Sequence, residues 1–169
     1  MISNCTITSS CEIDGNYRHW LRRSWDSKKK HGVFIALNPS KADHLVCDPT
    51  MCNMNNLALK WQWGGFYILN LFAYMATDRD LMLAHAAPIG PRNDDVIRTI
   101  CESDEPIVLS WGREDRKLIG DRSKAVKQLL RSINRSNCCC LDVSKNNDGY
   151  QHPCVIDITE YPYPKPITI

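Results

Sequence analysis

Polar side chains of the kinds that bind ligands or activate water follow the first strongly apolar segment of the chain. The run 33–37 (VFIAL) is followed by Asn38, Ser40, Asp43 and Asp48. An amide can align a water molecule by hydrogen bonding, a hydroxyl both donates and accepts, and a carboxylate can act as a base. A buried segment that delivers these groups into one short loop therefore indicates a binding or catalytic site.

A second apolar run, 66–72, is interrupted by Asn70 and followed by Tyr74. Burying an amide costs a few kcal/mol unless its donors and acceptors are satisfied. The partner of Asn70 is either the backbone of a neighbouring loop or a ligand with matching donor and acceptor edges, such as a nucleobase. The pattern leaves both alternatives open.

Polar or unusual residues also follow the two later apolar runs, 106–111 and 138–143. The first of these ends in Trp111 and is followed by Arg113, and the second is followed by a polar loop that leads to His152. Arg113, in the polar group at the end of this run, is a candidate ligand-binding residue. Each apolar run of this chain thus ends beside a group with useful chemistry.

The elements that must position these residues can be read from periodicity. The four apolar runs predict four strands, and between them lie helical patterns. Met54, Leu57, Ala58 and Trp61 share one helical stripe after a predicted cap at Asp48. Further helices are expected after a possible cap at 78, over 92–102, and around the stripe 126–133. Alternating strands and helices predict a single three-layer α/β/α domain with a small, mainly parallel four-stranded sheet. Ligands of such sheets bind at the carboxyl ends of the strands.

The two ends of the chain are less regular. Residues 1–31 form a mixed extension, in which Asp14-Gly15 predicts a hairpin turn. The stretch 17–25 interleaves aromatic and basic residues, including Arg18. It is either an edge strand or helix with solvated arginines, or a surface that meets phosphate or stacks a base. The tail 159–169 has proline at 162, 164 and 166, and we expect it to be extended and largely unpaired.

Composition limits the classes of partner and compartment. The net charge is only +2, so no strong overall field indicates a membrane or nucleic acid partner. The longest apolar run is too short to span a bilayer, and the first residues lack the pattern of a secretory signal, so a cytoplasmic location is expected. The nine cysteines include no CxxC pair, and the nearest potential ligand set is His44, Cys47 and Cys52. We therefore expect reduced thiols, no metal and no cofactor.

Several long motifs resemble a bacterial and phage family known only as domain-of-unknown-function family 1643. They are Tyr17-Arg18 with Trp25, LNPSKADHLVCDPT from 37, NLFAYMATD from 70, GPRND from 90, SWG from 110, and Gln151-His152-Pro153. This resemblance supplies no activity.

The order of the motifs also resembles the uracil-DNA glycosylase superfamily, in its mismatch-specific branch. Residues 37–40 (LNPS) are similar to a first motif "INPG", and 68–70 (ILN) to a second motif "LLN". Residues 110–112 (SWG) are similar to "LWG", and 152–153 (HP) to the start of a late histidine loop. The resemblance implies a uracil-DNA-glycosylase-like fold.

The same resemblance implies roles for individual residues. Asn38 would position the attacking water with help from Asp43, Asn70 would read the base edge, and His152 would support the departing base. Ser40 stands where the first motif has glycine, and its side chain narrows the access of a ligand to the backbone. The chain after His152 supplies no wedge side chain that could fill the space left by a flipped base. These departures favour the binding of a nucleotide over the binding of duplex DNA.

Three functions follow from the sequence. The first is a glycosylase-like hydrolase of an N-glycosidic bond in modified DNA or a nucleotide. The second is a binding protein that sequesters a nucleotide or nucleotide-derived signal without turnover, and the third is an α/β domain that contacts a protein partner. The predicted catalytic residues are Asn38, Asp43 and His152, and the predicted ligand-binding residues are Arg18, Ser40, Asn70, Tyr74, Trp111 and Arg113. The expected partner is a nucleobase, a nucleotide or DNA.

Overall fold

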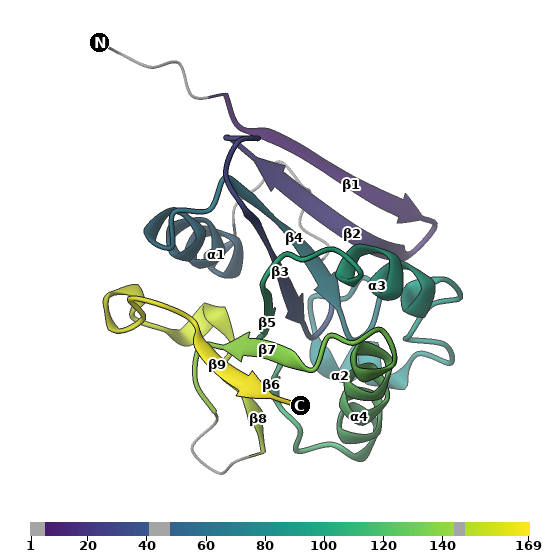
Figure 1. Ribbon diagram of the computed structural model, residues 1–169. Helices are drawn as coiled ribbons and strands as arrows, with labels where there is room; N and C mark the ends of the chain where they lie inside the picture. The colour runs from purple at the N-terminus through teal and green to yellow at the C-terminus, as the bar shows by residue number, and fades with distance from the viewer. Residues whose placement is uncertain (1–5, 41–47, 144–147) are drawn as a thin grey trace.

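The computed structural model describes residues 6–40, 48–143 and 148–169 (Figure 1). Within these ranges a seven-stranded sheet has the order β1-β2-β4-β3-β5-β7-β9. Its strands are β1 (Thr8–Asp14), β2 (Tyr17–Ser24), β3 (His31–Ala36), β4 (Gly65–Asn70), β5 (Ile107–Leu109), β7 (Asn137–Cys140) and β9 (Lys165–Thr168). A separate two-stranded ribbon pairs β6 (Gly112–Arg113) with β8 (Gly149–Tyr150).

The helices lie between and after the strands. They are α1 (Pro49–Lys60), α2 (Arg79–Ala84), α3 (Asn93–Cys101) and α4 (Lys117–Ser132), followed by the short 3-10 helices η1 (Pro153–Val155) and η2 (Ile158–Glu160). Asp48 caps α1 by accepting from the Met51 N–H, and Asp78 caps α2 by accepting from the N–H groups of Asp80 and Leu81. Both predicted caps are confirmed.

The four strands predicted from the apolar runs form the centre of the sheet. β3 pairs in parallel with β4 on one side and β5 on the other, and β5 pairs in parallel with β7. The prediction of a mainly parallel arrangement is confirmed for these strands. The predicted size of four strands is wrong, because antiparallel strands extend the sheet at both edges.

The N-terminal extension and the tail supply these additional strands. The β1–β2 hairpin turns at Gly15, where φ is +56°, and β2 pairs with β4. The tail was expected to be largely unpaired, which is wrong for β9. β9 pairs with β7, and Pro166 lies opposite Cys139. An edge strand tolerates proline because only one of its sides needs backbone donors.

Helices cover both faces of the sheet, which gives the predicted α/β/α layers (Figure 1). Side chains of β3 alternate between the faces. Phe34 packs with α1 residues such as Leu57, whereas Ile35 packs in the cluster formed with α2, α3 and α4, including Ile97. The consecutive cysteines of β7 alternate in the same way. Cys138 belongs to the cluster formed with α2, α3 and α4, and Cys139 packs against the cluster formed with α1. No helix within the described ranges has the length and apolar character needed to cross a bilayer.

Candidate functional site

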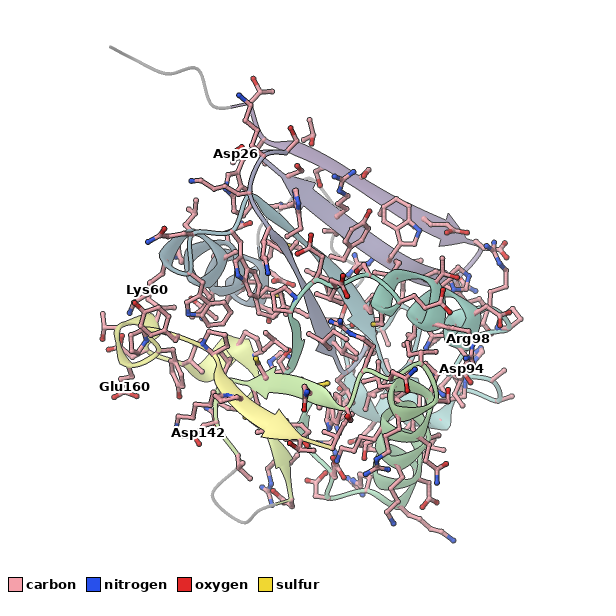
Figure 2. The ribbon with its side chains drawn as sticks, viewed as in Figure 1. Asp26, Lys60, Asp94, Arg98, Asp142 and Glu160 are labelled. Atoms are coloured by element: carbon pink, nitrogen blue, oxygen red, sulfur yellow. The ribbon has the colours of Figure 1, made fainter. Side chains whose placement is uncertain are left out.

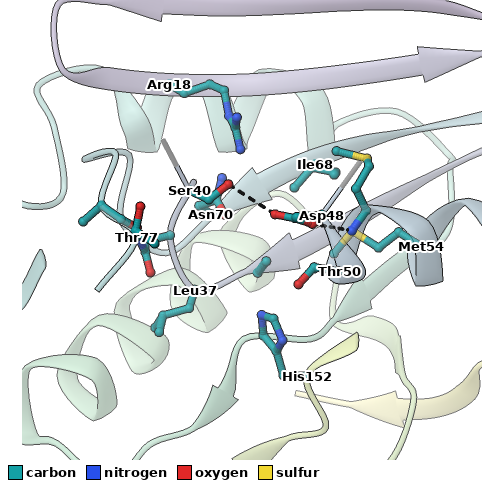
Figure 3. A pocket seen from close by; sticks show the side chains of 14 residues that line it. Arg18, Leu37, Ser40, Asp48, Thr50, Met54, Ile68, Asn70, Thr77 and His152 are labelled. Atoms are coloured by element: carbon teal, nitrogen blue, oxygen red, sulfur yellow. Dashed lines mark hydrogen bonds between the residues drawn. The ribbon is translucent and has the colours of Figure 1, made fainter. Parts of the chain in front are cut away.

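A cavity of about 190 Å³ lies at the carboxyl ends of β3 and β4, beside the first turn of α1 (Figure 3). It lies on the α1 face of the sheet, where Met54 and Ile68 form part of its apolar wall. Its polar lining consists of Arg18, Asn38, Ser40, Asp48, Thr50, Asn70, Thr77 and His152. Five of the nine predicted site residues thus line one cavity, at the place where parallel sheets bind ligands.

The amide of Asn38 has a fixed orientation. Its Nδ2 donates to the carbonyl oxygen of Ala76 at 2.7 Å and to that of Pro39 at 3.2 Å. Both N–H groups of the amide are therefore used by the backbone, and the first of these bonds ties the loop after β3 to the loop after β4. The carbonyl Oδ1, an acceptor, is the part of Asn38 that can meet a ligand or a water molecule.

Ser40 and Asp48 form one hydrogen-bonded unit at the start of α1. Ser40 Oγ donates to Asp48 Oδ2 at 3.2 Å, and Asp48 Oδ1 accepts from the Met51 N–H at 2.8 Å. Each carboxylate oxygen of Asp48 therefore accepts a hydrogen bond. This carboxylate both caps the helix and forms part of the cavity wall.

Asn70 lies at the end of β4 and is 2% exposed. Within the described part of the chain, its Nδ2 is buried and has no hydrogen-bond partner. An unsatisfied buried donor costs about 1–3 kcal/mol. Of the two alternatives that the sequence left open, the backbone partner is not found for this nitrogen, whereas an acceptor on a bound ligand would satisfy it.

His152 enters the cavity from the loop after β8. Its Nδ1 accepts from the Cys154 N–H at 3.2 Å, so the proton of the neutral ring is on Nε2. Burial lowers the pKa of the His152 imidazole, while the Asp48 carboxylate acts in the opposite direction. The ring is held near α1 because Asn53 Nδ2 donates to the Pro153 carbonyl at 2.6 Å. His152 therefore presents a neutral N–H donor.

Arg18 reaches the cavity from β2 and is 7% exposed. Burial lowers the pKa of its guanidinium, and Cys11 and Asp48 act in the opposite direction. An arginine nevertheless stays protonated in proteins. The cavity wall thus contains a permanent cation and, at Asp48, a carboxylate.

Three predicted ligand-binding residues lie elsewhere. The Tyr74 ring stacks on His85 with centroids 3.9 Å apart and lines a separate cavity of about 280 Å³. Trp111 is 1% exposed, packs on the opposite face of the sheet, and donates from Nε1 to Glu114. Trp111, predicted to bind the ligand, therefore does not line the cavity of Asn70 and His152.

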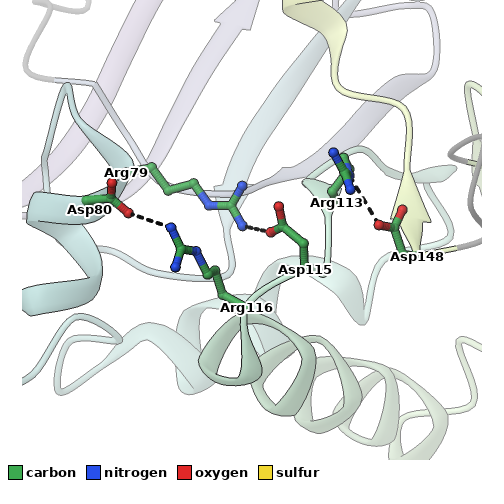
Figure 4. Close-up of polar contacts among 6 residues, drawn as sticks. All are labelled: Arg79, Asp80, Arg113, Asp115, Arg116 and Asp148. Carbon is green, nitrogen blue, oxygen red and sulfur yellow. Dashed lines mark hydrogen bonds and ion pairs between the residues drawn. The ribbon is translucent and has the colours of Figure 1, made fainter.

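The third, Arg113, is exposed and forms an ion pair with Asp148 at 3.1 Å (Figure 4). The same figure shows two further ion pairs, Arg79 with Asp115 and Arg116 with Asp80. These pairs balance the surface charge near the start of α4. The predicted catalytic residue Asp43 lies outside the described residues.

The sequence assigned Asp48 to the helix cap and did not include Thr50 or Thr77 among the site residues, although all three line the cavity. Asp48 and Thr50 flank the first residue of α1. Because the start of a helix that follows a strand lies at the same edge of the sheet as the carboxyl end of that strand, this position would have indicated both residues. Thr77 was visible as a polar residue after the second strand.

No group of three metal-ligating side chains occurs among the described residues. His44 and Cys47, of the nearest set in the sequence, lie outside them. Burial raises the pKa of the Cys101 thiol to about 12 and that of Cys138 to about 11. Because the thiolate is the form that binds metals, these two thiols are packing residues.

Comparisons with curated proteins and with solved structures found no match. A family model described as "Protein of unknown function (DUF1643)" matches residues 18–154. The matched segment begins at Arg18 and ends two residues after His152, so it includes the whole polar lining of the cavity. The chain belongs to the DUF1643 family.

Proposed function

We propose that this protein recognises a nucleobase in the cavity and hydrolyses the N-glycosidic bond that joins it to a sugar, in modified DNA or in a nucleotide. The observation that carries the proposal is the buried Nδ2 of Asn70, which has no hydrogen-bond partner among the described residues and lies in one cavity with Asn38 and His152. The order of these residues in the chain also supports our proposal of a distant relation to the uracil-DNA glycosylase superfamily.

The size of the cavity favours a single ring. Pockets for drug-sized ligands measure about 300–1,000 Å³, whereas this cavity measures about 190 Å³. Asn70 Nδ2 and His152 Nε2 supply donors, and Asn38 Oδ1 supplies an acceptor. A base with carbonyl oxygens toward Asn70 and His152 satisfies these groups, as flipped bases are read in other enzymes.

The hydrolysis requires little of the protein beyond positioning and electrostatics. The bond between the sugar C1′ and the ring nitrogen breaks, and its electron pair stays on the ring. The oxygen of a water molecule forms the new bond to C1′, and the proton that this water loses is finally taken up by the ring. Asn38 Oδ1 would align the water, and His152 would donate to the ring as negative charge develops on it. Asp43 keeps its proposed role as an aid to the water.

Binding without turnover is the second candidate, and one observation favours it. Asp48 is the carboxylate among the described residues of the cavity wall, and both of its oxygens accept hydrogen bonds from Ser40 and Met51. These bonds hold Asp48 as the cap of α1 and as part of the cavity wall, so neither oxygen is free of a protein donor. A cavity of this kind would hold a nucleotide and release it unchanged.

The test is a search for bound and released bases by mass spectrometry. The purified protein is mixed with nucleosides, nucleotides, and single- and double-stranded oligonucleotides that carry modified bases. We expect base release that is lost in Asn38→Ala and Asn70→Leu and retained in Arg98→Gln, whose exposed side chain lies on α3 (Figure 2). Folding of each variant is checked by circular dichroism.

Each outcome has a defined meaning. Binding without release favours the sequestering protein, and no binding by a folded protein overturns both candidates. A binding constant that falls steeply with salt indicates contact with several phosphates, and thus DNA over a free nucleotide.

A further inference from the structure

The strand β2 is irregular at one position, and this irregularity decides where Arg18 points. On β1, Glu12 pairs with Trp20 but its neighbour Ile13 pairs with Arg18, so His19 has no residue opposite it. A residue inserted in this way is a β-bulge, which changes the face that a side chain takes and is frequent beside active sites.

The effect can be followed in the packing. Trp20 packs on the face of α2, α3 and α4, whereas Leu21 packs on the α1 face. In a regular strand, Arg18 and Trp20 would share a face because they are two residues apart. Arg18 instead lines the cavity on the α1 face. The bulge thus brings a buried cation to the cavity wall.

The charges around the cavity show what this cation can do. Among the described lining residues, the titratable or charged side chains are those of Arg18, Asp48 and His152. In Figure 3, Arg18 and His152 enter the view from opposite sides, with Asn70, Ser40 and Asp48 between them. His152 is a neutral donor, because its Nδ1 accepts from the Cys154 N–H and burial lowers the pKa of its ring. Arg18 is the permanent positive charge.

We propose that Arg18 is a catalytic residue that stabilises the negative charge on the ring as the bond to C1′ breaks. The inference rests on the proposed function, since the anion is the product of that bond cleavage. Hydrogen bonds from a cation to an anionic acceptor are roughly twice as strong as those between neutral groups. The guanidinium of Arg18 therefore contributes more to this stabilisation than the neutral N–H of His152.

The first test measures binding of free rings and needs no turnover. The probes are uracil, 5-fluorouracil and 5-nitrouracil, whose ring N–H groups become more acidic in that order, and the method is calorimetry at pH 7.5. We expect the affinity to rise along the series in the wild-type protein and in Arg98→Gln. Arg18→Gln should remove this rise, and Arg18→Lys should restore part of it. If none of the three rings binds, or if the affinity rises along the series in Arg18→Gln as it does in the wild-type protein, the inference is wrong.

The second test separates this inference from the proposed function. Base release is measured with nucleosides or oligonucleotides that carry the same three rings. Removal of one group that stabilises developing charge costs about 10²–10³-fold in rate, and we expect Arg18→Gln to lose most with the least acidic ring. If the wild-type protein releases no base but Arg18→Gln abolishes the preference for acidic rings, the hydrolysis is wrong and the anion-binding role of Arg18 holds. If release occurs and Arg18→Gln lowers it equally for all three rings, the hydrolysis holds and the role of Arg18 is wrong.

Discussion

Two buried asparagines meet at the end of β4 and differ in what their amides do. Asn93, at the start of α3, is 0% exposed, and its Nδ2 donates to the carbonyl oxygens of Asn70 and Leu71 at 3.0 Å each. The Oδ1 of Asn93 has no partner within the described residues. The side chain of Asn70 points to the cavity on the other face, and its Nδ2 donates to no described group. One asparagine satisfies backbone carbonyls of the fold, and for the other we propose a ligand as the partner.

Two buried arginines also lie on opposite faces of the sheet. Arg122 on α4 is 4% exposed, and its Nε donates to the Leu71 carbonyl at 2.7 Å while its terminal nitrogen pairs with Asp94. Arg18 is 7% exposed and lines the cavity. Asn93 and Arg122 thus bond backbone carbonyls on the face of α3 and α4, whereas Asn70 and Arg18 line the cavity on the α1 face. We propose that Asn70 and Arg18, on the second face, serve a ligand.

The largest expected effect on stability is that of Arg122→Met. The change removes a charge-assisted hydrogen bond to the Leu71 carbonyl and the pair with Asp94. We expect a loss of about 2–3 kcal/mol in the free energy of unfolding, measured with urea. Lys124→Met, at an exposed position of the same helix, should change it by less than about 0.5 kcal/mol. Equal stability of the two variants would contradict the structural role of Arg122.

Asn93→Leu should have a smaller effect of the same sign. The change leaves the Asn70 carbonyl without this donor, while the Leu71 carbonyl keeps the bond from Arg122. We expect a loss of about 1–2 kcal/mol in the free energy of unfolding, again measured with urea. A variant as stable as the wild-type protein would show that the Nδ2 bonds of Asn93 contribute nothing net.

Asn70→Leu is the matched change on the cavity face, and it should separate stability from binding. Because Nδ2 has no hydrogen-bond partner in the described ranges, we expect the free energy of unfolding to change by less than about 0.5 kcal/mol or to rise. Affinity for the free rings should fall at least tenfold, as measured by calorimetry. A destabilisation equal to that of Asn93→Leu would show that the two asparagines contribute equally to the free energy of unfolding.

The central layer of this fold could be predicted because it follows from local patterns. Residues 33–36 of the first apolar run are buried on both faces as part of β3, and the spacing from Met54 to Trp61 predicted α1 with its cap at Asp48. The outer strands could not be predicted in the same way. β9 pairs with β7 although Pro166 interrupts its pattern, and the hairpin joins the sheet through β2 beside β4. Such pairings depend on contacts between residues far apart in the chain.

The candidate site could be predicted in part, for a related reason. The rule that ligands meet the carboxyl ends of parallel strands brought Asn38, Asn70 and His152 to one cavity. It did not give the face of the sheet on which each side chain lies. Trp111 follows β5 as Asn38 follows β3, yet it packs on the α4 side. Arg18 reaches the cavity through a bulge, and the sequence carries no local signal for the face that this gives it.

The smallest expected effect concerns His152 and the pH dependence of stability. Burial lowers the pKa of this ring in the folded protein below its ordinary value of about 6.5. As the pH falls below that ordinary value, the unfolded chain takes up a proton that the folded chain does not, so the contribution of His152 to stability is full at pH 7.5 and declines toward pH 5. His152→Asn keeps an acceptor for the Cys154 N–H and removes the titrating ring. The free energy of unfolding of the variant should therefore fall less between pH 7.5 and pH 5 than that of the wild-type protein, because the other histidines are common to both.

Parallel pH curves would mean that the ring of His152 is as well solvated in the folded protein as in the unfolded chain. In that case the cavity would be open to water at His152, and the neutral donor proposed there would be a protonated one at mildly acidic pH.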